Sequence, residues 1–414
     1  MKNRRAGGSL LAMLAAASLA VAGLAAPAAA AAPGVTKKAV KVGFITDITG
    51  IASSTFEDSA QGIAARFALQ NAHGGVNGRK LELVTADTTS TPAGAQTAAQ
   101  DLVETKGVFA VAEVSALFFG AYHYLNQQGI PVVGTSLDGP EWYQQPNTNM
   151  FNIEGTNSPN YPSYTQWGKF WKATGAKKIS IVMSQTPSSQ RAGQQEINSI
   201  KAVGLQTCDD TVVPLGGVNF SAWALSFKNA GCDGAECSCV LSSSLAMATA
   251  IKNLGLTDVK IDFAAGPSQG VFANQATLSA AEGAYFPGTN FDPTYQKPAS
   301  KAMLAALRKY DPSYKGGIPD LGLSDGWEVG DLFIKGLQVA GKNPTRQSFI
   351  ANLRKVGNFD AGGLLPHPVS FRNFGQAPKQ SCILSAHFVD GKYQAFPASG
   401  KPFCGTLIPN SNAS

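Results

Sequence analysis

The sequence lacks several features that would mark whole classes of protein. No cysteine directly follows the apolar N-terminal stretch, so a lipid anchor at an export cleavage site is not expected. No later run reaches the roughly 18 consecutive apolar residues that a membrane helix needs, so the mature chain is expected to be soluble. Basic residues are scattered, whereas a nucleic-acid surface needs a basic face with base-reading partners, so nucleic acid is not an expected partner.

The N-terminus has the composition of an export signal. Lys2, Arg4 and Arg5 precede an apolar stretch, which is followed by alanines that offer cleavage sites. We predict that residues 1–32 are a cleaved signal peptide and that the protein works in the periplasm or in the extracellular cell envelope. The paired arginines leave both the general and the twin-arginine export routes open. Cleavage would lower the formal charge from +6 to +3, because this segment carries three basic and no acidic residues.

The cysteines predict disulfides. Six remain after cleavage: Cys208, Cys232, Cys237, Cys239, Cys382 and Cys404. An even number in an exported chain favours disulfides, although six cysteines allow 15 pairings. Cys382 and Cys404 flank the last predicted hairpin and are expected to pair. No other Cys or His lies at ligand spacing from Cys237 and Cys239, so neither a metal site nor another cofactor is expected.

The pattern along the chain is typical of an α/β fold. Short β-rich runs alternate with longer amphipathic ones, as in βαβ units around a parallel sheet. One set of strands is expected at 41–47, 81–87, 108–115 and 130–136, and a second at 177–184, 206–214, 237–243 and 260–266. Thr91 and Pro92 are typical of the start of a helix, and Asp390-Gly391 predicts a hairpin turn. We therefore predict two doubly wound sheets in tandem.

Several strings resemble one family: "GGVNGRKLEL" at 74–83, "YLNQQGIPVVGTS" at 124–136 and "AIKNLGL" at 250–256. The sequence resembles, over about residues 39–396, the type I periplasmic solute-binding proteins of ABC importers, branched-chain amino acid (Leu/Ile/Val) class. The resemblance implies two Rossmann-like lobes joined by three crossovers, with bounds 39–152 plus 290–360 for the first and 155–286 plus 364–408 for the second. It also implies a monomeric, non-enzymatic receptor that delivers a small carboxylate-bearing solute, such as an amino acid or an aromatic acid, to a membrane permease.

The resemblance also assigns site residues. Ser115, Ala116, Thr135 and Ser136 fall in the carboxylate-binding loops, where backbone N–H groups and hydroxyls can hold an anion. The alternative is that Ser115 only caps a helix and Thr135 only forms a turn. Further expected cleft residues are Thr55 and Phe56 in a closing loop, Trp142 on an irregular loop, Ser188 near the place of a cleft tyrosine, and Ser268 with Gln269.

Ser268 lies in Gly266-Pro267-Ser268-Gln269-Gly270, which matches the nucleophile elbow of serine hydrolases. His367 and His387 follow in the order that a catalytic triad would need. In amino-acid binders of the resembled family this stretch often reads Gly-Pro-Glu-Gly, with the acidic residue on the ligand ammonium. Ser268 in that place argues against a standard α-amino acid, since an unpaired buried charge costs several kcal/mol. A hydrolase and a sensor for a signalling partner stay as alternatives.

The family fold also bears on the disulfides. A doubly wound order places the strand at 177–184 between the strands that hold Cys208 and Cys239, which disfavours a bridge between those two. Cys232 with Cys237 is the pairing expected instead.

Overall fold

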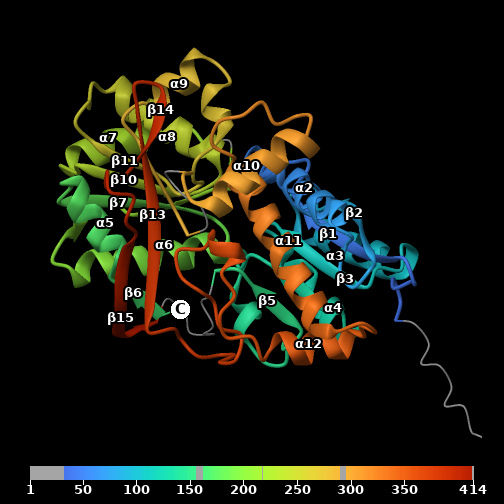
Figure 1. The fold of residues 1–414 in the computed structure, drawn as a ribbon. Helices are drawn as coiled ribbons and strands as arrows, with labels where there is room; N and C mark the ends of the chain where they lie inside the picture. Colours follow the sequence, from blue (N-terminus) through green and yellow to red (C-terminus); the bar gives the residue numbers. More distant parts are fainter. Residues whose placement is uncertain (1–31, 155–161, 217, 290–294, 413–414) are drawn as a thin grey trace, which may run out of the picture. The chain divides into compact units, whose positions relative to one another are not determined.

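The computed structural model describes residues 32–154, 162–216, 218–289 and 295–412, which are coloured in Figure 1. The predicted signal peptide lies outside the described residues except for Ala32. No helix of the described part is long and apolar enough to cross a membrane. Two sheets organise these residues, and the α/β class predicted from the sequence is confirmed.

The first sheet is parallel throughout, with strand order β2-β1-β3-β4-β5. Its strands are β1 (Ala39–Thr46), β2 (Lys80–Asp87), β3 (Ala110–Val114), β4 (Val132–Gly134) and β5 (Met150–Asn152). Helices along this part of the chain are α1 (Ser53–Phe56), α2 (Ser59–Ala72), α3 (Pro92–Gln100), a π-helical turn at Asp101–Thr105 and α4 (Tyr122–Gln127). The helix start predicted at Thr91 is confirmed, because its side chain accepts a hydrogen bond from the Gly94 N–H.

Three helices from later in the chain pack on this first sheet. They are α10 (Pro298–Tyr310), α11 (Leu321–Ala340) and α12 (Arg346–Leu353). Phe333 of α11 lies 5.7 Å from Phe67, and Phe349 of α12 lies 5.9 Å from Phe109, between ring centroids. The first core therefore joins segments that are more than 200 residues apart in the sequence.

The second sheet is mixed, with strand order β6-β15-β13-β12-β11-β10-β7-β8, while β14 pairs with β13 and β9 with β7. Its strands are β6 (Pro162–Tyr164), β7 (Lys178–Ser184), β8 (Gln206–Thr207), β9 (Thr211–Val213), β10 (Gly234–Ser238), β11 (Lys260–Phe263), β12 (Tyr285–Gly288), β13 (Gln380–Val389), β14 (Lys392–Ala395) and β15 (Phe403–Asn412). Its helices are α5 (Gln166–Thr174), α6 (Pro187–Ala202), α7 (Ser221–Asn229), α8 (Leu241–Asn253) and α9 (Gln275–Ala281). Short 3₁₀ turns lie at Phe118–Gly120, Pro140–Tyr143, Gln269–Phe272 and Ala361–Gly363.

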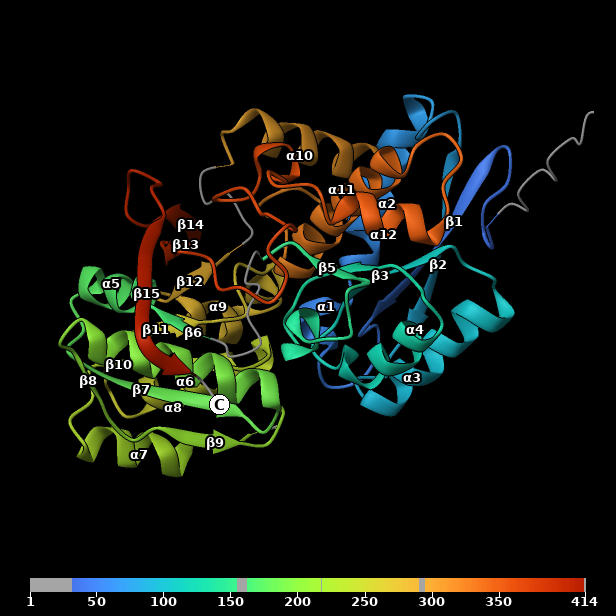
Figure 2. The same ribbon diagram turned by 90° about the horizontal axis from the view of Figure 1, so that it is seen from below.

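Strand β7 is buried on both faces, as parallel strands covered by helices are. Ile179 and Ile181 pack with residues of α5 and α6, whereas Val182 packs with residues of α7 and α8. Figure 2 shows the strands of this sheet between these helices. Alternate residues of one strand thus fill two different cores, which explains the nearly continuous apolar run in its sequence.

Two strand expectations need correction. The run at 206–214 is two short strands, β8 and β9, because it turns at Asp209, which has a positive φ of 50°. The strand expected at 237–243 ends at Ser238, opposite Met183 of β7, and α8 begins at Leu241. The hairpin at Asp390-Gly391 is confirmed, since both residues have positive φ and β13 pairs with β14 across them.

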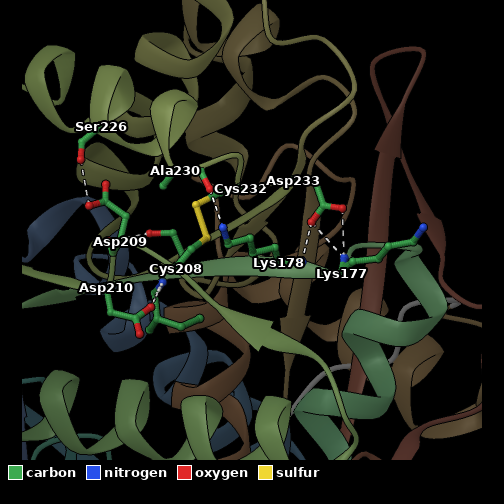
Figure 3. The surroundings of a disulfide bond; sticks show 11 residues. Lys177, Lys178, Cys208, Asp209, Asp210, Ser226, Ala230, Cys232 and Asp233 are labelled. Carbon is green, nitrogen blue, oxygen red and sulfur yellow. Dashed lines mark hydrogen bonds between the residues drawn. A yellow bond between two sulfur atoms is a disulfide. The ribbon is translucent and has the colours of Figure 1, made fainter.

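The disulfides confirm one expected pair and contradict the other. Cys382 pairs with Cys404, and these residues lie opposite each other on β13 and β15. Cys232 pairs with Cys208 rather than Cys237, and Cys237 pairs with Cys239. Cys232 lies in the turn before β10 and reaches Cys208 across β7, with Cα atoms 6.3 Å apart (Figure 3). Cys232 precedes β10 in a turn, so the strand spacing that disfavours a Cys208–Cys239 bridge does not apply to it.

Candidate functional site

Two adjoining cavities of about 240 and about 160 Å³ form the candidate ligand cleft. Both are lined by Leu137, Ser188, Ala192, Ser238, Ala264 and Leu321, so we treat them as one cleft. Leu137, Ser238 and Ala264 lie at or after the carboxyl ends of strands from both sheets. Ligands of open α/β sheets bind at these ends.

Five of the residues expected from the sequence line this cleft. Thr55, Phe56 and Ala116 line the smaller cavity, Ser136 lines the larger one, and Ser188 lines both. Thr55 also accepts a hydrogen bond of 3.2 Å from the Leu241 N–H, so it ties α1 to the start of α8. Whether these side chains contact a ligand stays a prediction.

Ser115 and Thr135 are completely buried and line neither cavity. Their N–H groups donate to the two carboxylate oxygens of Glu113, at 3.0 and 2.8 Å. Ser115 Oγ and the Ala116 N–H donate to the two oxygens of Asp47, at 3.1 and 3.2 Å. Burial raises the pKa values of Asp47 and Glu113, and these hydrogen bonds oppose that rise. The loops expected to hold a ligand carboxylate therefore hold two carboxylates of the protein.

Trp142 belongs to a separate hydrophobic cluster of the first sheet, with Phe118, Leu125 and Met150, and not to the cleft. Its side chain is 1% exposed, its ring centroid lies 5.7 Å from that of Phe118, and its Nε1–H donates to Asp138 Oδ1 at 2.7 Å. The hydrogen bond satisfies the indole N–H inside the protein, so the irregular backbone around Trp142 is explained by packing.

Ser268 and Gln269 line a separate cavity of about 510 Å³, together with Asp320. Ser268 Oγ accepts a hydrogen bond from the Gly270 N–H, and the backbone of Ser268 bonds to the Tyr393 hydroxyl. His387 instead contacts the Gly283 carbonyl, and His367 contacts the Pro368 carbonyl. The described residues do not bring a histidine to Ser268, so the serine caps a 3₁₀ turn and no triad is assembled.

The structure also brings acidic residues to the cleft that the sequence analysis missed. Glu154, Glu196, Glu236 and Asp325 line the larger cavity. Burial raises the pKa of Glu154 to about 7 and that of Glu196 to about 8. Burial and the charges of Glu196 and Asp262 raise the pKa of Glu236 well above its usual range. One signal was available in the sequence, because a single glutamate within an apolar buried strand is rare unless it has a role or a partner.

The acidic cleft residues differ in their partners. Ser136 Oγ donates to Glu154 at 2.8 Å, Trp171 Nε1–H donates to Glu196 at 2.5 Å, and Ser238 Oγ donates to Glu236 Oε1 at 2.7 Å. No basic residue is found among the described residues that line the cleft. The cleft therefore offers carboxyl groups to a ligand, and their raised pKa values favour the neutral form while no cation is bound.

The fold occurs in several solved structures. A leucine-binding protein from Thermotoga maritima has a TM-score of 0.70 at 18% identity, with 86% of this chain and 97% of that one covered. The substrate-binding protein of a fatty acid ABC transporter from Thermomonospora curvata has a TM-score of 0.72 at 17% identity, with 92% and 95% covered. An ABC-transporter solute-binding protein from R. palustris in complex with benzoate has a TM-score of 0.71 at 17% identity, with 91% and 99% covered.

A search of curated proteins finds no match. The family model for periplasmic binding proteins, in contrast, matches residues 39–391, which is most of the chain. Together with the two sheets and the cleft at their strand ends, this match confirms the predicted resemblance: the chain belongs to the type I periplasmic binding proteins, which bind solutes and are not enzymes.

Proposed function

We propose that this protein is the exported solute receptor of an ABC importer, which captures a small solute in the cleft and delivers it to a membrane permease. The position of the cleft is the main support, because its lining comes from the strand ends of both sheets. A solute bound there would contact both halves of the chain, so that closure around it could be sensed by a permease.

The proposal includes the organisation implied by the sequence. Residues 1–32 are removed on export, and the protein acts as a monomer. One lobe consists of 39–152 with 290–360, the other of 155–286 with 364–408, and the two close by hinge motion about three crossovers. The order of elements supports these bounds, since α10 to α12 pack on the first sheet and β13 to β15 complete the second.

The solute class expected from the sequence is a small carboxylate, either an amino acid or an aromatic acid. The leucine and benzoate ligands of the fold relatives support that class. The contacts of Glu113 and Asp47 count against it, since they already use the N–H groups of Ser115, Ala116 and Thr135. The receptor function rests on the cleft and does not depend on this class.

The test of receptor function uses protein purified after export from cells that express the full chain. Solutes are screened by thermal shift, and a ligand at about 1,000 times its dissociation constant should stabilise the protein by roughly 4 kcal/mol. The stabilising solute is then added with the protein to liposomes that contain a candidate ABC permease from the same organism. We expect the loaded protein to stimulate ATP hydrolysis, and hydrolysis that stays at the rate seen with unloaded protein would refute the proposal.

Ser188→Trp gives a specific variant for this test. Ser188 lines both cavities, so an indole there should fill the cleft and abolish the thermal shift and the stimulation of ATP hydrolysis. Ser221→Trp is the matched control, because Ser221 is exposed at the start of α7 and lines neither cavity. Loss of both responses in the control as well would mean that the effect does not come from the cleft.

A further inference from the structure

We propose that the cleft selects an organic cation, a small molecule with an ammonium or guanidinium group and no free carboxylate. This inference rests on the proposed receptor function and names its substrate class. Glu154, Glu196, Glu236 and Asp325 surround the larger cavity, and they come from four separate parts of the chain. A ligand inside that cavity would face carboxyl groups from several directions, and a cation among them would favour their ionised form.

Unused hydrogen-bonding atoms in the cavity wall point to a ligand. Glu236 is 1% exposed, and within the described part of the chain its Oε2 atom has no hydrogen-bond partner. The same holds for Oε1 of Gln166, which is 6% exposed. Both side chains line the larger cavity. Buried acceptors are costly when left without a donor, so a ligand that carries N–H groups would relieve both.

The carboxyl group of Asp262, next to Glu236, also lacks hydrogen-bond partners in the described structure. Asp262 lies directly opposite Glu236 in the ladder between β10 and β11. Neither carboxylate oxygen of Asp262 has a hydrogen-bond partner among the residues that the structure describes, and the charge of Glu196 raises the pKa values of both neighbours. Carboxylates this close cannot all ionise in a buried site without a cation.

The protein itself does not supply that cation within the described lining. None of the described cleft residues is Lys, Arg or His. The segments 155–161 and 290–294, which follow the cleft residues Glu154 and Thr289 in the sequence, contain no basic residue either. Arg191 lies on the same helix as Glu196 but acts on Glu141, where burial raises the pKa and the Arg191 charge opposes the rise.

A metal ion and an anion both fit less well than an organic cation. No three His, Cys, Asp or Glu side chains of the described residues are grouped so that they could hold a metal ion. The N–H groups that would hold an anionic ligand are bonded to Glu113 and Asp47. Trp167 and Tyr164 also line the larger cavity, and aromatic faces attract cations. The apolar residues Leu137, Leu321 and Ile383 leave room for a hydrocarbon part of the ligand.

The experiment compares three sets of probes by thermal shift and calorimetry on the exported protein at pH 8. Agmatine, putrescine and phenethylamine are the cations, benzoate and isoleucine carry a carboxylate, and glucose and glycerol are neutral. We expect stabilisation by at least one cation and by none of the others. Stabilisation by a carboxylate or a neutral probe alone would overturn the inference and leave the receptor function intact, whereas silence from all three sets would count against both.

Glu236→Gln tests the same idea without changing the size of the side chain. We expect it to weaken binding of the stabilising cation by roughly 10- to 100-fold, the effect of removing a charge-assisted hydrogen bond. Glu328→Gln is the control, because Glu328 is also buried and has an oxygen without a partner in the described structure, but it does not line the cleft. Equal affinities in the two variants would overturn the inference.

Proton release gives an independent readout. Glu154 accepts from Ser136, while Glu196 accepts from Trp171 and is repelled by Asp210, Glu236 and Asp262. With a pKa of about 8, Glu196 is ionised in about a tenth of the molecules at pH 7 and in about nine tenths at pH 9. A cation should therefore bind up to about tenfold more tightly at pH 9 than at pH 7 and should release protons, seen as a binding enthalpy that depends on the buffer. An affinity that is flat between these pH values would overturn the inference.

Discussion

Strands β3 and β10 each lie third from one edge of their sheet, in the orders β2-β1-β3 and β8-β7-β10, and each carries a glutamate with a different outcome. Glu113 of β3 lies opposite Ile45 of β1, and Glu236 of β10 lies opposite Ile181 of β7. Each glutamate is followed two residues later by a serine that contacts it. Glu113 is satisfied at both oxygens, whereas one oxygen of Glu236 has no partner in the described part of the chain.

The two glutamates differ because of the strand that lies beside each one, β4 next to Glu113 and β11 next to Glu236. Gly134 of β4 lies opposite Glu113, and a Cβ atom there would come within 2.0 Å of Glu113 Oε1. Glycine thus allows the Thr135 N–H to reach the carboxylate. In the second sheet the residue opposite Glu236 is Asp262, a second carboxylate instead of a donor. The same topology therefore makes a carboxylate with both oxygens bonded in one sheet and a carboxyl group with one oxygen bonded, lining the cleft, in the other.

The sharpest test of this comparison is the pair Glu113→Ala and Glu236→Ala. Loss of Glu113 leaves the N–H groups of Ser115 and Thr135 buried without an acceptor, which should cost about 4 kcal/mol. Loss of Glu236 leaves the Ser238 hydroxyl without its acceptor and enlarges an existing cavity, but it also removes a carboxyl group that is close to Asp262. We therefore expect the free energy of unfolding to fall by about 1 kcal/mol or less. Denaturant unfolding at pH 7 measures both, and equal costs would contradict the comparison.

Disulfides distinguish the two regions further, since all six cysteines lie in the part of the chain that builds the second sheet. The Cys208–Cys232 bridge spans 24 residues and the Cys237–Cys239 bridge only two. Replacing Cys208 and Cys232 by serine should lower the free energy of unfolding by about 3 kcal/mol, and replacing Cys237 and Cys239 by about half as much. A disulfide that closes a longer loop removes more conformational entropy from the unfolded chain. Denaturant unfolding measures both losses of stability. A larger loss on removal of the Cys237–Cys239 bridge would contradict this prediction.

Hydrogen exchange locates the effect of the first replacement. We expect faster exchange in β7 and β10, which flank the Cys208–Cys232 bridge, and unchanged exchange in β1 and β3. Equal acceleration in both sheets would mean that the two regions unfold as one unit.

The sequence was sufficient for features that depend on local signals or on repeated patterns. The α/β class, the helix start at Thr91, the turn at Asp390-Gly391 and the Cys382–Cys404 pair are all of this kind. The acidic cleft is of another kind, because Glu236 and Asp262 are 26 residues apart and meet only through the register of two strands. The contacts of Glu113 with Thr135 likewise follow from register and from the missing side chain of Gly134. No pattern within either segment predicts these pairs.

The last expected effect is a slope of stability with pH, to which Glu196 of the second region contributes. Burial raises the pKa of Glu196 in the folded protein to about 8, so the folded state binds more protons than the unfolded state between about pH 4.5 and pH 8. The stability from this group is therefore complete below about pH 4.5 and falls as the pH rises to about 8, by about 1.4 kcal/mol per pH unit at most. Urea unfolding at pH 5, 6, 7 and 8 without ligand should show this fall, and Glu196→Gln should reduce it. An unchanged slope in Glu196→Gln would contradict this prediction, and a saturating cation should flatten the wild-type slope by holding Glu196 ionised.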